Sequence, residues 1–473
     1  MVSEEIRAII LAAGKGTRMK TSLPKVMHSI LGKTLLERVI NAAFKVEEIN
    51  KTYVIVGYQA DTVTEYITSK YPSEQVKTVL QEPQLGTGDA VFKVFDYLTD
   101  FDGSVIVLCG DTPLIRTETL EKFILSHKNS GAVLTVMTAI LANPTNYGRI
   151  IRDENDLIRK IVEEKDATPS QKAIKEINAG IYCFDWQKIA PAFFDLTTDN
   201  EQGEYYLTDI IDWAVSEGYK TNAYILEDNQ EVFGINSQKQ LAEASKILRN
   251  RKLQELMASG VTIIDPKNTW ISPETSIKAE TLVYPGCYIE GQNCFGKRNV
   301  IGPNTFIKGN VITQDNVKII QSRVSDAKIS ANVTVGPFAN IRDKADIGES
   351  VRIGNFVEIK NSAINKNSNV SHLSYIGDAE LGKDVNIGAG TITANYNALT
   401  KEKSKTIISD GVKTGSNSVL VAPLVIDKNA HIGAGSVITK DVPKGALAVT
   451  RAPLSILKNW VTKKLKDLKN LNK

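Results

Sequence analysis

A period of six residues runs through the second half of the chain and restricts its fold more than any other feature. Neither the period of two typical of a strand nor the 3.6 of a helix explains this spacing. Stacked repeats do, because each hexad can form one short flat face whose aliphatic side chain points into a shared core. The sequence therefore predicts a β-helix with three hexads per turn, a prism whose flat sides favour association about a threefold axis. The periodic aliphatic or aromatic residues are Ile271, Ile277, Val283, Ile289, Phe295, Ile301, Ile307, Ile329, Val335, Ile341, Ile347, Ile353, Ile359, Leu420, Ile426, Ile432 and Ile438.

The first half, up to about residue 238, has a different pattern. Alternating strands and helices predict an α/β doubly wound sheet there. Ligands of such sheets bind at the carboxyl ends of the strands. The aliphatic runs typical of buried parallel strands are 7–11, 52–57, 76–81 and 104–111. The stretches with apolar residues at helical spacing are 35–46, 89–98 and 117–128.

A glycine-rich bend directly follows the first of these strands, in the sequence IILAAGKGTRM at 9–19. Glycines allow backbone amides to approach a ligand closely, and amides together with Lys15 and Arg18 suit an oligophosphate. The bend lacks the spacing of a P-loop, and Met19 occupies the place of the third glycine in the dinucleotide fingerprint. Taken alone, the bend leaves a phosphate site and an ordinary turn both open.

Bulk composition excludes several classes of partner and location. With 473 residues, 42% of them hydrophobic and 23% charged, the chain is long enough for two or three folded domains. A net charge of +3 is too small to indicate nucleic acid as the main partner. The N-terminus lacks the apolar core of a signal peptide, and no segment has 18 uninterrupted apolar residues. We therefore expect a cytoplasmic protein without membrane insertion.

The cysteines and histidines do not form metal-binding patterns. The four cysteines lack C-x-x-C spacing and are predicted to be buried free thiols in a reducing compartment. The four histidines form no H-x-x-x-H cluster, so a zinc site is not expected.

A charged helical stretch at 237–260 separates the two patterns and ends in Gly260, a common stop signal. Its composition suits an exposed connecting arm. The predicted boundaries are a first domain at 1–238, a helical linker at 239–259 and a repeat domain with a C-terminal helix at 260–473.

Two segments interrupt the repeat. Residues 395–406 depart from the six-residue period and are predicted to protrude as a loop. The end of the chain is predicted to be a basic amphipathic helix, which could bind a membrane. Packing against the end of the β-helix or against a neighbouring subunit is the preferred interpretation. The residues of its apolar face are Leu457, Trp460, Val461, Leu465 and Leu468.

A series of short motifs recurs in a characteristic order: LAAGKGTRM, LPKV, QLGTG, GDTPL, YGRI, IVEEKDA, EINAGIY, GEYYLTD, GPFANIR, GNFVEIK, SHLSYIGDAELG, NIGAGTITANY and LVAPL. In this order, and over essentially its whole length, the chain resembles the bifunctional N-acetylglucosamine-1-phosphate uridylyltransferases and glucosamine-1-phosphate N-acetyltransferases, the GlmU family. The resemblance implies a nucleotidyltransferase domain followed by a left-handed parallel β-helix. It also implies acetyl transfer from acetyl-CoA to glucosamine 1-phosphate, then uridylyl transfer from UTP with release of pyrophosphate. The product, UDP-N-acetylglucosamine, would feed peptidoglycan and lipopolysaccharide synthesis.

Carried over position by position, the resemblance implies a first site in the α/β half. Its nucleotide-binding residues would be Leu11, Ala12, Ala13, Gly14, Gln81, Gly86, Thr87 and Gly110. Its catalytic cations on the phosphates would be Arg18 and Lys25. Its amino-sugar ligands would be Gly148, Glu163 and Asn178, and its Mg²⁺ ligands Asp111 and Asn236.

Elementary chemistry agrees with this set of residues. The attacking oxygen of a sugar 1-phosphate is already an anion, so uridylyl transfer requires no general base. Cations and amides instead relieve charge repulsion and align the reactants. A hard cation held by few protein oxygens, with phosphates completing its shell, is typical of Mg²⁺.

The resemblance places acetyl transfer in the repeat half. An amine attacks a thioester only when it is unprotonated, so a base that titrates near neutral pH is useful. His372 matches the family's catalytic position and Glu358 could orient it, whereas His431 precedes a hexad aliphatic residue and is interpreted as structural. Because trimeric members bind acetyl-CoA between subunits, a homotrimer is expected. The implied sugar-phosphate ligands are Arg342, Lys360, Tyr375 and Asn386, and the implied acetyl-CoA ligands are Ala389, Asn395, Tyr396, Ser416, Ala434 and Arg451.

Three features depart from the family's pattern. Asp89 and Glu164 each stand where the family usually has a histidine, and NYN, in a longer loop at 395–406, replaces the common NYDG. That loop borders the acetyl-CoA residues.

Two other functions remain open at this stage. One is a sugar-1-phosphate nucleotidylyltransferase whose β-helix only oligomerises it, which would not need His372 together with Lys360 and Tyr375. The other is a noncatalytic assembly protein, as among translation-initiation exchange-factor subunits, in which the glycine bend need not be intact.

Overall fold

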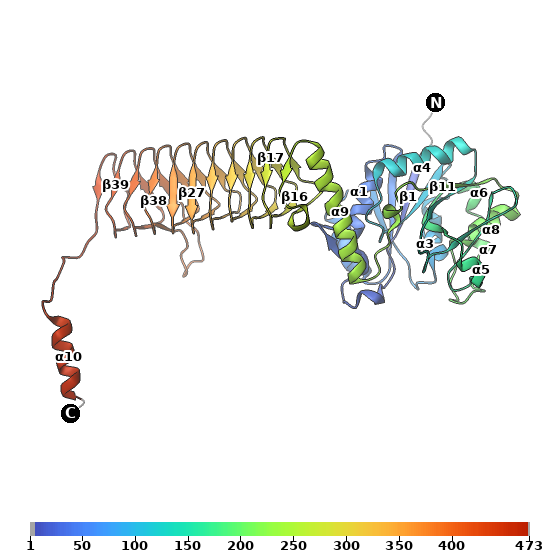
Figure 1. Ribbon diagram of the computed structural model, residues 1–473, viewed down its shortest axis with the longest axis horizontal. Coiled ribbons are helices and arrows are strands. Elements are labelled where there is room, and N and C mark those ends of the chain that lie inside the picture. Colours follow the sequence, from blue (N-terminus) through green and yellow to red (C-terminus); the bar gives the residue numbers. More distant parts are fainter. Residues whose placement is uncertain (1–4, 472–473) are drawn as a thin grey trace. The chain divides into compact units, whose positions relative to one another are not determined.

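The computed structural model describes residues 5–471 and divides into two compact units, Met1–Asn250 and Arg251–Lys473 (Figure 1). Residues 1–4, on which part of the signal-peptide argument rests, lie outside the described residues. The division falls inside helix α9 (Gln238–Ala258), which the sequence predicted as a linker. No helix among residues 5–471 combines the length and apolar character needed to cross a bilayer.

The first unit is built on a mixed β-sheet. Its strands are β1 (Ile6–Leu11), β4 (Ile49–Val56), β5 (Val76–Leu80), β6 (Ser104–Cys109), β7 (Leu134–Ile140), β8 (Arg149–Arg152), β9 (Ile158–Val162), β10 (Glu176–Asp185) and β11 (Thr221–Ile225), with a separate hairpin of β2 (Ser29–Ile30) and β3 (Lys33–Thr34). The main strand order is β11-β7-β10-β6-β1-β4-β5, and β8 joins β10 to β9. As predicted, β1 runs parallel to both β4 and β6, and β4 runs parallel to β5. β10 is antiparallel to both of its neighbours, β6 and β7.

Helices cover both faces of this sheet, which makes it doubly wound. They are α1 (Leu35–Phe44), α2 (Ala60–Thr68), α3 (Thr87–Phe92), α4 (Thr117–Ser130), α5 (Pro169–Lys172), α6 (Trp186–Ile189), α7 (Ala192–Asp195) and α8 (Asp209–Ser216). Because successive side chains of a strand point to opposite faces, Ile10 packs in one apolar layer with Leu36 of α1, and Ile9 packs in the other with Val91 of α3.

One predicted helix of this unit is broken. The apolar pattern at 89–98 predicted a continuous helix, but α3 ends at Phe92 and a separate 3₁₀ turn covers Phe95–Tyr97. The rings of Phe92 and Phe95 each lie 5.1 Å from the ring of Phe194, a contact distant in sequence that the local pattern does not contain. Tertiary packing therefore overrides the local helical period here.

The second unit is a parallel β-helix with three faces over residues 262–448. Face 1 contains β12 (Thr262–Ile263), β15 (Leu282–Val283), β18 (Val300–Ile301), β21 (Lys318–Ile319), β24 (Thr334–Val335), β27 (Arg352–Asn355), β30 (Asn369–His372), β33 (Asn386–Ile387), β36 (Lys413–Thr414), β39 (His431–Ile432) and β41 (Leu447–Ala448). Face 2 contains β13 (Trp270–Ile271), β16 (Tyr288–Gly291), β19 (Phe306–Gly309), β22 (Arg323–Ser325), β25 (Asn340–Arg342), β28 (Glu358–Lys360), β31 (Tyr375–Gly377), β34 (Ile392–Ala394), β37 (Val419–Val421) and β40 (Val437–Ile438). Face 3 contains β14 (Ser276–Ile277), β17 (Cys294–Phe295), β20 (Ile312–Thr313), β23 (Lys328–Ile329), β26 (Asp346–Ile347), β29 (Ala363–Ile364), β32 (Ala379–Leu381), β35 (Thr406–Ile408) and β38 (Leu424–Ile426).

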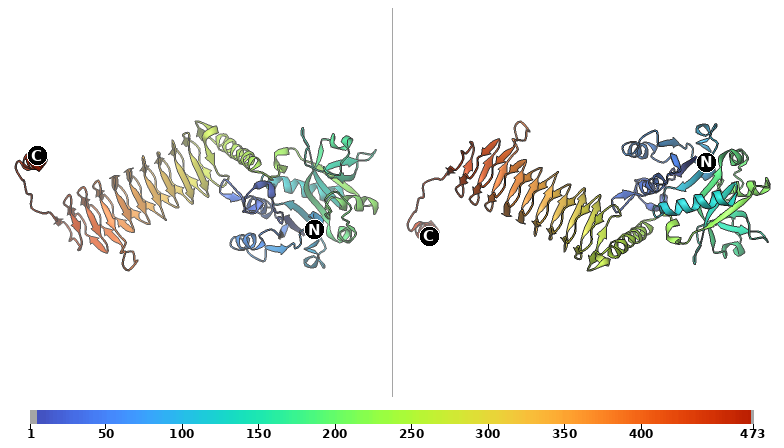
Figure 2. Two further views of the ribbon diagram at one scale, coloured as in Figure 1. Left: turned by 90° about the horizontal axis from the view of Figure 1, so that it is seen from below. Right: turned by 90° about the horizontal axis from the view of Figure 1, so that it is seen from above.

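Strand register confirms the predicted hexads. Ile271 pairs with Ile289, which pairs with Ile307, so one turn takes 18 residues, or three hexads. The periodic aliphatic residues that predicted the fold are all buried in one continuous core. Figure 2 shows the stacked turns in two further views. The architecture is the predicted one of a left-handed hexapeptide β-helix.

The predicted loop is also present. At the predicted loop, 395–406, the register offset grows from 17 residues, as between Tyr375 and Ile392, to 27, as between Ile392 and Val419, and the extra residues before β35 protrude (Figure 1). Tyr396 and Lys403 form an antiparallel bridge at the base of this loop, and Leu399 near its tip is 94% exposed.

The predicted burial of one cysteine is wrong, and only part of the prediction for the C-terminal helix is observed. Cys294 is exposed, because it is the outward residue of β17 whereas Phe295 points into the core. The C-terminal helix α10 (Trp460–Leu471) forms as predicted, but its apolar side chains are exposed within this single chain: Trp460 at 53%, Val461 at 61% and Leu465 at 55%. Among the described residues this helix does not pack against the chain's own β-helix, and packing against a neighbouring subunit stays a prediction.

Candidate active sites

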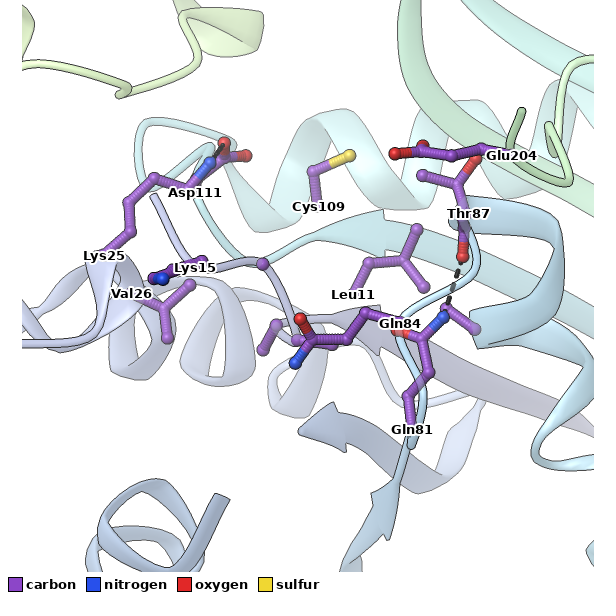
Figure 3. Close-up of a pocket in the computed structure, with 15 residues that line it drawn as sticks. Leu11, Lys15, Lys25, Val26, Gln81, Gln84, Thr87, Cys109, Asp111 and Glu204 are labelled. Carbon is purple, nitrogen blue, oxygen red and sulfur yellow. Dashed lines mark hydrogen bonds and ion pairs between the residues drawn. The ribbon is translucent and has the colours of Figure 1, made fainter. Parts of the chain in front are cut away.

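A cavity of about 380 Å³ lies at the carboxyl ends of β1 and β6 in the first unit (Figure 3). The sequence-predicted residues that line it are Leu11, Ala12, Ala13, Gly14, Lys25, Gln81, Gly86, Thr87 and Asp111. Gly110 lies directly behind them, since a Cβ added to it would approach the carbonyl oxygen of Leu11 to 3.0 Å. Widely separated parts of the sequence thus meet where the doubly wound fold predicts a ligand.

The glycine bend forms one wall of the cavity. Gly16 has a φ of 64°, and a Cβ there would lie 2.5 Å from Cβ of Lys25, so only glycine allows the bend to pass so close to that lysine. Met19 is buried and anchors the end of the bend. Arg18, predicted as a catalytic cation, is exposed on the 3₁₀ turn Thr17–Met19 and does not line the cavity, whereas Lys15 does.

Lys25 and Asp111, which line this cavity, form a polar cluster with Asn236. Nζ of Lys25 lies 2.5 Å from Oδ2 of Asp111 and 3.0 Å from Oδ1 of Asn236. The two oxygens are held side by side because the backbone N–H of Ile235 donates to the carbonyl oxygen of Asp111. Two oxygen ligands therefore already converge on one positive charge.

The other wall is the segment that carries Gly86 and Thr87. The Gln81 side-chain amide donates to the carbonyl oxygen of Gly86 at 2.9 Å, a bond drawn in Figure 3. The Thr87 hydroxyl accepts from the backbone N–H of Leu207 at 3.0 Å. Gly86 has a φ of 119°, and a Cβ there would collide with backbone atoms of Tyr205. The wall is therefore anchored to the 204–207 segment.

Gly148, Glu163 and Asn178, predicted to hold the amino sugar, form a second cluster. A Cβ on Gly148 would lie 3.2 Å from Oε1 of Glu163 and 3.5 Å from Cβ of Asn178. A register shift in β10 between Asn178 and Tyr182 bends the strand here, as β-bulges often do at functional sites. The bend brings Gly180 against Cys109, which lines the nucleotide cavity, so the two clusters adjoin.

Several lining residues were not among the site residues that the family resemblance implied, although Lys15 had already been noted as a cation of the glycine bend. They are Lys15, Val26, Gln84, Ala90, Cys109 and Glu204. The signals for four of them were available, because Lys15, Val26, Gln84 and Glu204 belong to the motifs LAAGKGTRM, LPKV, QLGTG and GEYYLTD. Cys109 and Ala90 carried no signal, because nothing in a single sequence distinguishes a lining residue from an ordinary buried one.

Glu164, one of the departures from the family's pattern, has a structural partner. Its carboxylate accepts from Nη2 of Arg149 at 2.6 Å, and Arg149 is almost completely buried. Since a buried guanidinium requires a counterion, Glu164 neutralises Arg149.

The carboxyl group of Glu163 is electrostatically perturbed. Burial, reinforced by Asp166 and Asp209, raises its pKa from 4.5 to about 7. Burial together with Asp212 and Asp166 raises the pKa of Asp209 to about 6. Perturbed carboxyl groups that cluster beside a cavity are typical of functional sites.

The raised pKa of Glu163 predicts a loss of stability with rising pH. Because the folded state binds this proton more tightly than the unfolded state, the stabilisation is complete at low pH and is lost as pH rises through about 7. Glu163→Gln should be more stable than the parent at pH 8, by on the order of 1–3 kcal/mol, with little difference at pH 5. Urea unfolding at the two pH values measures this, with the exposed Glu154→Gln as the matched control. Equal effects of Glu163→Gln at both pH values would contradict the assignment.

In the second unit, four predicted residues lie together on face 2. Arg342 pairs in register with Lys360, and Glu358 pairs with Tyr375. Two nitrogens of the Arg342 guanidinium bind Oε1 of Glu358, at 2.8 and 2.7 Å. Glu358 was expected to orient His372, but among the described contacts its carboxylate binds Arg342.

His372 and Asn386 lie on the adjoining face 1. His372 ends β30 with an exposed side chain, and the chain then turns at Leu373, which has a φ of 48°. Asn386 belongs to β33, the next strand of the same face. The predicted acetyl-transfer residues therefore surround one corner of the prism. His431, interpreted as structural, is exposed on β39 of face 1.

The predicted acetyl-CoA residues follow successive turns beyond that corner. The carbonyl oxygen of Ala389 accepts from the N–H of Asn417, next to Ser416, and the carbonyl oxygen of Ala434 accepts from Nε of Arg451 at 3.3 Å. Asn395 donates to Asp378, and Tyr396 is exposed at the start of the protruding loop. Asn395 and Tyr396 thus belong to the base of the loop that departs from the family's pattern.

Comparisons with known proteins cover both units. Residues 7–270 match the family model described as "Nucleotidyl transferase", and residues 326–361 match "Bacterial transferase hexapeptide (six repeats)". A relative from Clostridioides difficile (strain 630), named "Bifunctional protein GlmU", is 44% identical over 97% of this chain and 98% of its own. Relatives with the same name are 46% identical in Clostridium novyi (strain NT) and 44% identical in Synechococcus elongatus, again over 97% of this chain and over 98% and 99% of their own lengths.

Proposed function

From the premise that this chain belongs to the family of bifunctional GlmU proteins, we propose how its residues carry out the family's two reactions. The chain is an enzyme of UDP-N-acetylglucosamine synthesis that acetylates glucosamine 1-phosphate and transfers uridylyl to N-acetylglucosamine 1-phosphate. A single-activity enzyme with a merely structural β-helix is not supported, because the bifunctional relatives match over 97% of the chain, β-helix included. A noncatalytic assembly protein is equally unsupported.

The uridylyltransferase site is the cavity in the first unit, and the observation that carries this proposal is its composition. Backbone of the glycine bend and the ammonium groups of Lys15 and Lys25 face a space open enough for a nucleotide. Bound UTP would place its triphosphate against these positive groups, which reduce repulsion toward the incoming phosphate anion. Arg18 stays a proposed phosphate contact, supported by its position on the turn that ends the bend.

Asp111 and Asn236 fit a hard divalent cation, for which we propose Mg²⁺. Their oxygens lie within 3.0 Å of the same ammonium nitrogen, so they already point toward a shared positive charge. Carboxylate and amide oxygens are ligands that Mg²⁺ prefers. When bound, Mg²⁺ would neutralise phosphate charge. Lys25 would then contribute its own charge to the same phosphates.

N-acetylglucosamine 1-phosphate is proposed to bind over Gly148, Glu163 and Asn178. Gly148 leaves space where any side chain would meet Glu163. Above pH 7 the Glu163 carboxylate can accept hydrogen bonds from sugar hydroxyls, and the Asn178 amide, which donates to the Tyr182 hydroxyl at 2.7 Å, is held in place beside it.

Acetyl transfer is proposed at the corner between faces 1 and 2. Arg342 and Lys360 would hold the substrate phosphate, and Tyr375, whose hydroxyl lies against Gly377 in the strand beside Lys360, would complete the pocket. His372 would accept a proton from the amine. Acetyl-CoA would lie along the turns that carry Ala389, Asn395, Tyr396, Ser416, Ala434 and Arg451.

Omitting single substrates tests the two-reaction proposal. Purified protein given glucosamine 1-phosphate, acetyl-CoA, UTP and Mg²⁺ should release coenzyme A thiol and pyrophosphate. Without UTP it should accumulate N-acetylglucosamine 1-phosphate, and without acetyl-CoA it should release pyrophosphate only when that acetylated sugar is supplied. If UTP and glucosamine 1-phosphate without acetyl-CoA released pyrophosphate as fast as UTP and N-acetylglucosamine 1-phosphate do, the proposed order would be contradicted.

A homotrimer built through the β-helix is proposed, supported by its flat faces. To test this, the chain can be divided after residue 250. Ala244 packs in the first unit, whereas Leu253 and Leu256 pack in the β-helix core. A fragment of residues 251–473 should be trimeric, and a fragment of residues 1–250 should be monomeric and still make UDP-N-acetylglucosamine from the acetylated sugar phosphate. Light scattering distinguishes these states. A trimeric 1–250 fragment would overturn the assignment of the contact.

A further inference from the structure

Asp89, another departure from the family's pattern, lies behind the nucleotide cavity and touches a residue that lines it. It belongs to α3 and is 9% exposed. Its Oδ2 lies 2.8 Å from Nε2 of Gln81, and its Oδ1 lies 3.1 Å from Nζ of Lys93. Lys93 and Asp89 form an ion pair one turn apart on and just after α3. Asp89 thus places a buried negative charge against the Gln81 amide.

The partners of Gln81 determine which way its amide faces. The carbonyl oxygen of Gly86 and the ionised carboxylate of Asp89 can only accept hydrogen bonds. The group turned toward them must therefore be the NH₂ group, and both of its hydrogens are used. The reversed amide would place an oxygen against two other oxygens.

The remaining polar atom of Gln81 is its carbonyl oxygen, Oε1. No described residue donates a hydrogen bond to it, yet it is not among the fully buried polar atoms without a partner, so it is open to the cavity. Gln81 itself is 3% exposed and follows β5, where its backbone N–H donates to Val56. The cavity therefore presents one rigid acceptor at this point.

We infer that Asp89 is a positioning residue that fixes the Gln81 amide with Oε1 toward the nucleotide base, and that this orientation selects uracil over cytosine. Uracil presents an N–H at ring position 3, which Oε1 can accept. Cytosine presents a lone pair at the same position, which Oε1 repels. The inference rests on the proposed function, in which Gln81 contacts the base of UTP.

The test compares UTP with CTP in the full-length enzyme, with N-acetylglucosamine 1-phosphate as the second substrate. In Asp89→Leu the Gln81 amide is free to rotate and exchange its oxygen and nitrogen. The KM for UTP should therefore rise about tenfold, the effect of one ordinary hydrogen bond, with kcat nearly unchanged. The ratio of kcat/KM for UTP to that for CTP should fall by a similar factor. Asp89→Asn, whose side-chain oxygen can still accept from Gln81, should restore the ratio to within about twofold of the parent. Asp96→Leu, which changes an exposed acid on the following turn, is the matched control and should behave as the parent.

The outcomes separate the inference from the proposal beneath it. Gln81→Leu should impair use of UTP. If it does, and Asp89→Leu keeps the parental ratio, the positioning role is overturned while the base contact stands. If Gln81→Leu has a normal KM for UTP, the base contact itself is wrong. If Asp89→Leu and Asp89→Asn lowered only kcat and kept the parental ratio of kcat/KM for UTP to that for CTP, Asp89 would be only structural. Should Asp89→Leu lack a cooperative thermal transition, Asp89→Ala carries the same expectation.

Discussion

Asp111→Ala should reduce uridylyl transfer at least about 100-fold and leave acetyl transfer unchanged. Losing one preorganised electrostatic group in an active site has this effect, and Asp111 contributes to two such groups. Its carboxylate is a proposed metal ligand, and it also holds Lys25 at 2.5 Å. Acetyl transfer should not respond, because its proposed residues all belong to the second compact unit. Pyrophosphate release and coenzyme A thiol release, followed in the same preparation, measure the two activities.

The same strand supplies the control. Asp102 precedes β6 and is exposed, whereas Asp111 follows the other end of that strand. Asp102→Ala therefore removes an equal charge away from the cavity and should leave both activities unchanged. Arg18→Ala should likewise lower uridylyl transfer and leave acetyl transfer unchanged. If Asp111→Ala lowers both activities together in a folded protein, the two-site arrangement is wrong.

The repeat half could be predicted from the sequence in detail, for a simple physical reason. Each turn of a β-helix contacts only the next turns, so its core is encoded locally, as the 18-residue step from Ile271 to Ile289 illustrates. The loop at 395–406 was predictable for the same reason, because an insertion breaks a local period.

Less of the α/β half could be predicted from a local sequence pattern. Its parallel strands were predictable from their aliphatic runs, but the antiparallel β10 and its bend at Asn178 were not, since bulges depend on packing across the sheet. The cluster that defines the cavity joins Lys25 to residues 86 and 211 positions away along the chain. No periodicity connects such residues, and only the family resemblance had grouped them. The amide orientation of Gln81 required the structure, because it depends on two acceptors that surround one side chain.

The pairing of Glu358 changes the expected role of one acetyl-site residue. Because its carboxylate binds the Arg342 guanidinium, Glu358 orients a group proposed to bind the substrate phosphate, and the His372 side chain is exposed at the end of its strand. His372 is therefore expected to act on the amine without a fixed carboxylate partner among residues 5–471.

His372→Ala should lower the turnover of acetyl transfer by roughly 10²–10⁴-fold, the range for removing a general base. The amine of glucosamine 1-phosphate is largely protonated at neutral pH, so a proton must leave before or during attack on the thioester. Histidine is the side chain whose ordinary pKa suits this transfer. Uridylyl transfer and the affinity for acetyl-CoA should stay nearly unchanged, because neither depends on that proton.

Coenzyme A thiol release, measured from pH 6 to 9, distinguishes a base from a packing residue. Turnover of the parent should rise along an acidic limb as the base loses its proton, and the His372→Ala variant should lack that limb. His431→Ala is the matched control: it removes another exposed histidine of face 1, from a different strand, and should retain both turnover and the limb. A uniform loss of turnover with the acidic limb intact would show that His372 only shapes the site. Normal turnover with an unchanged pH profile would remove His372 from the mechanism and leave water as the proton acceptor.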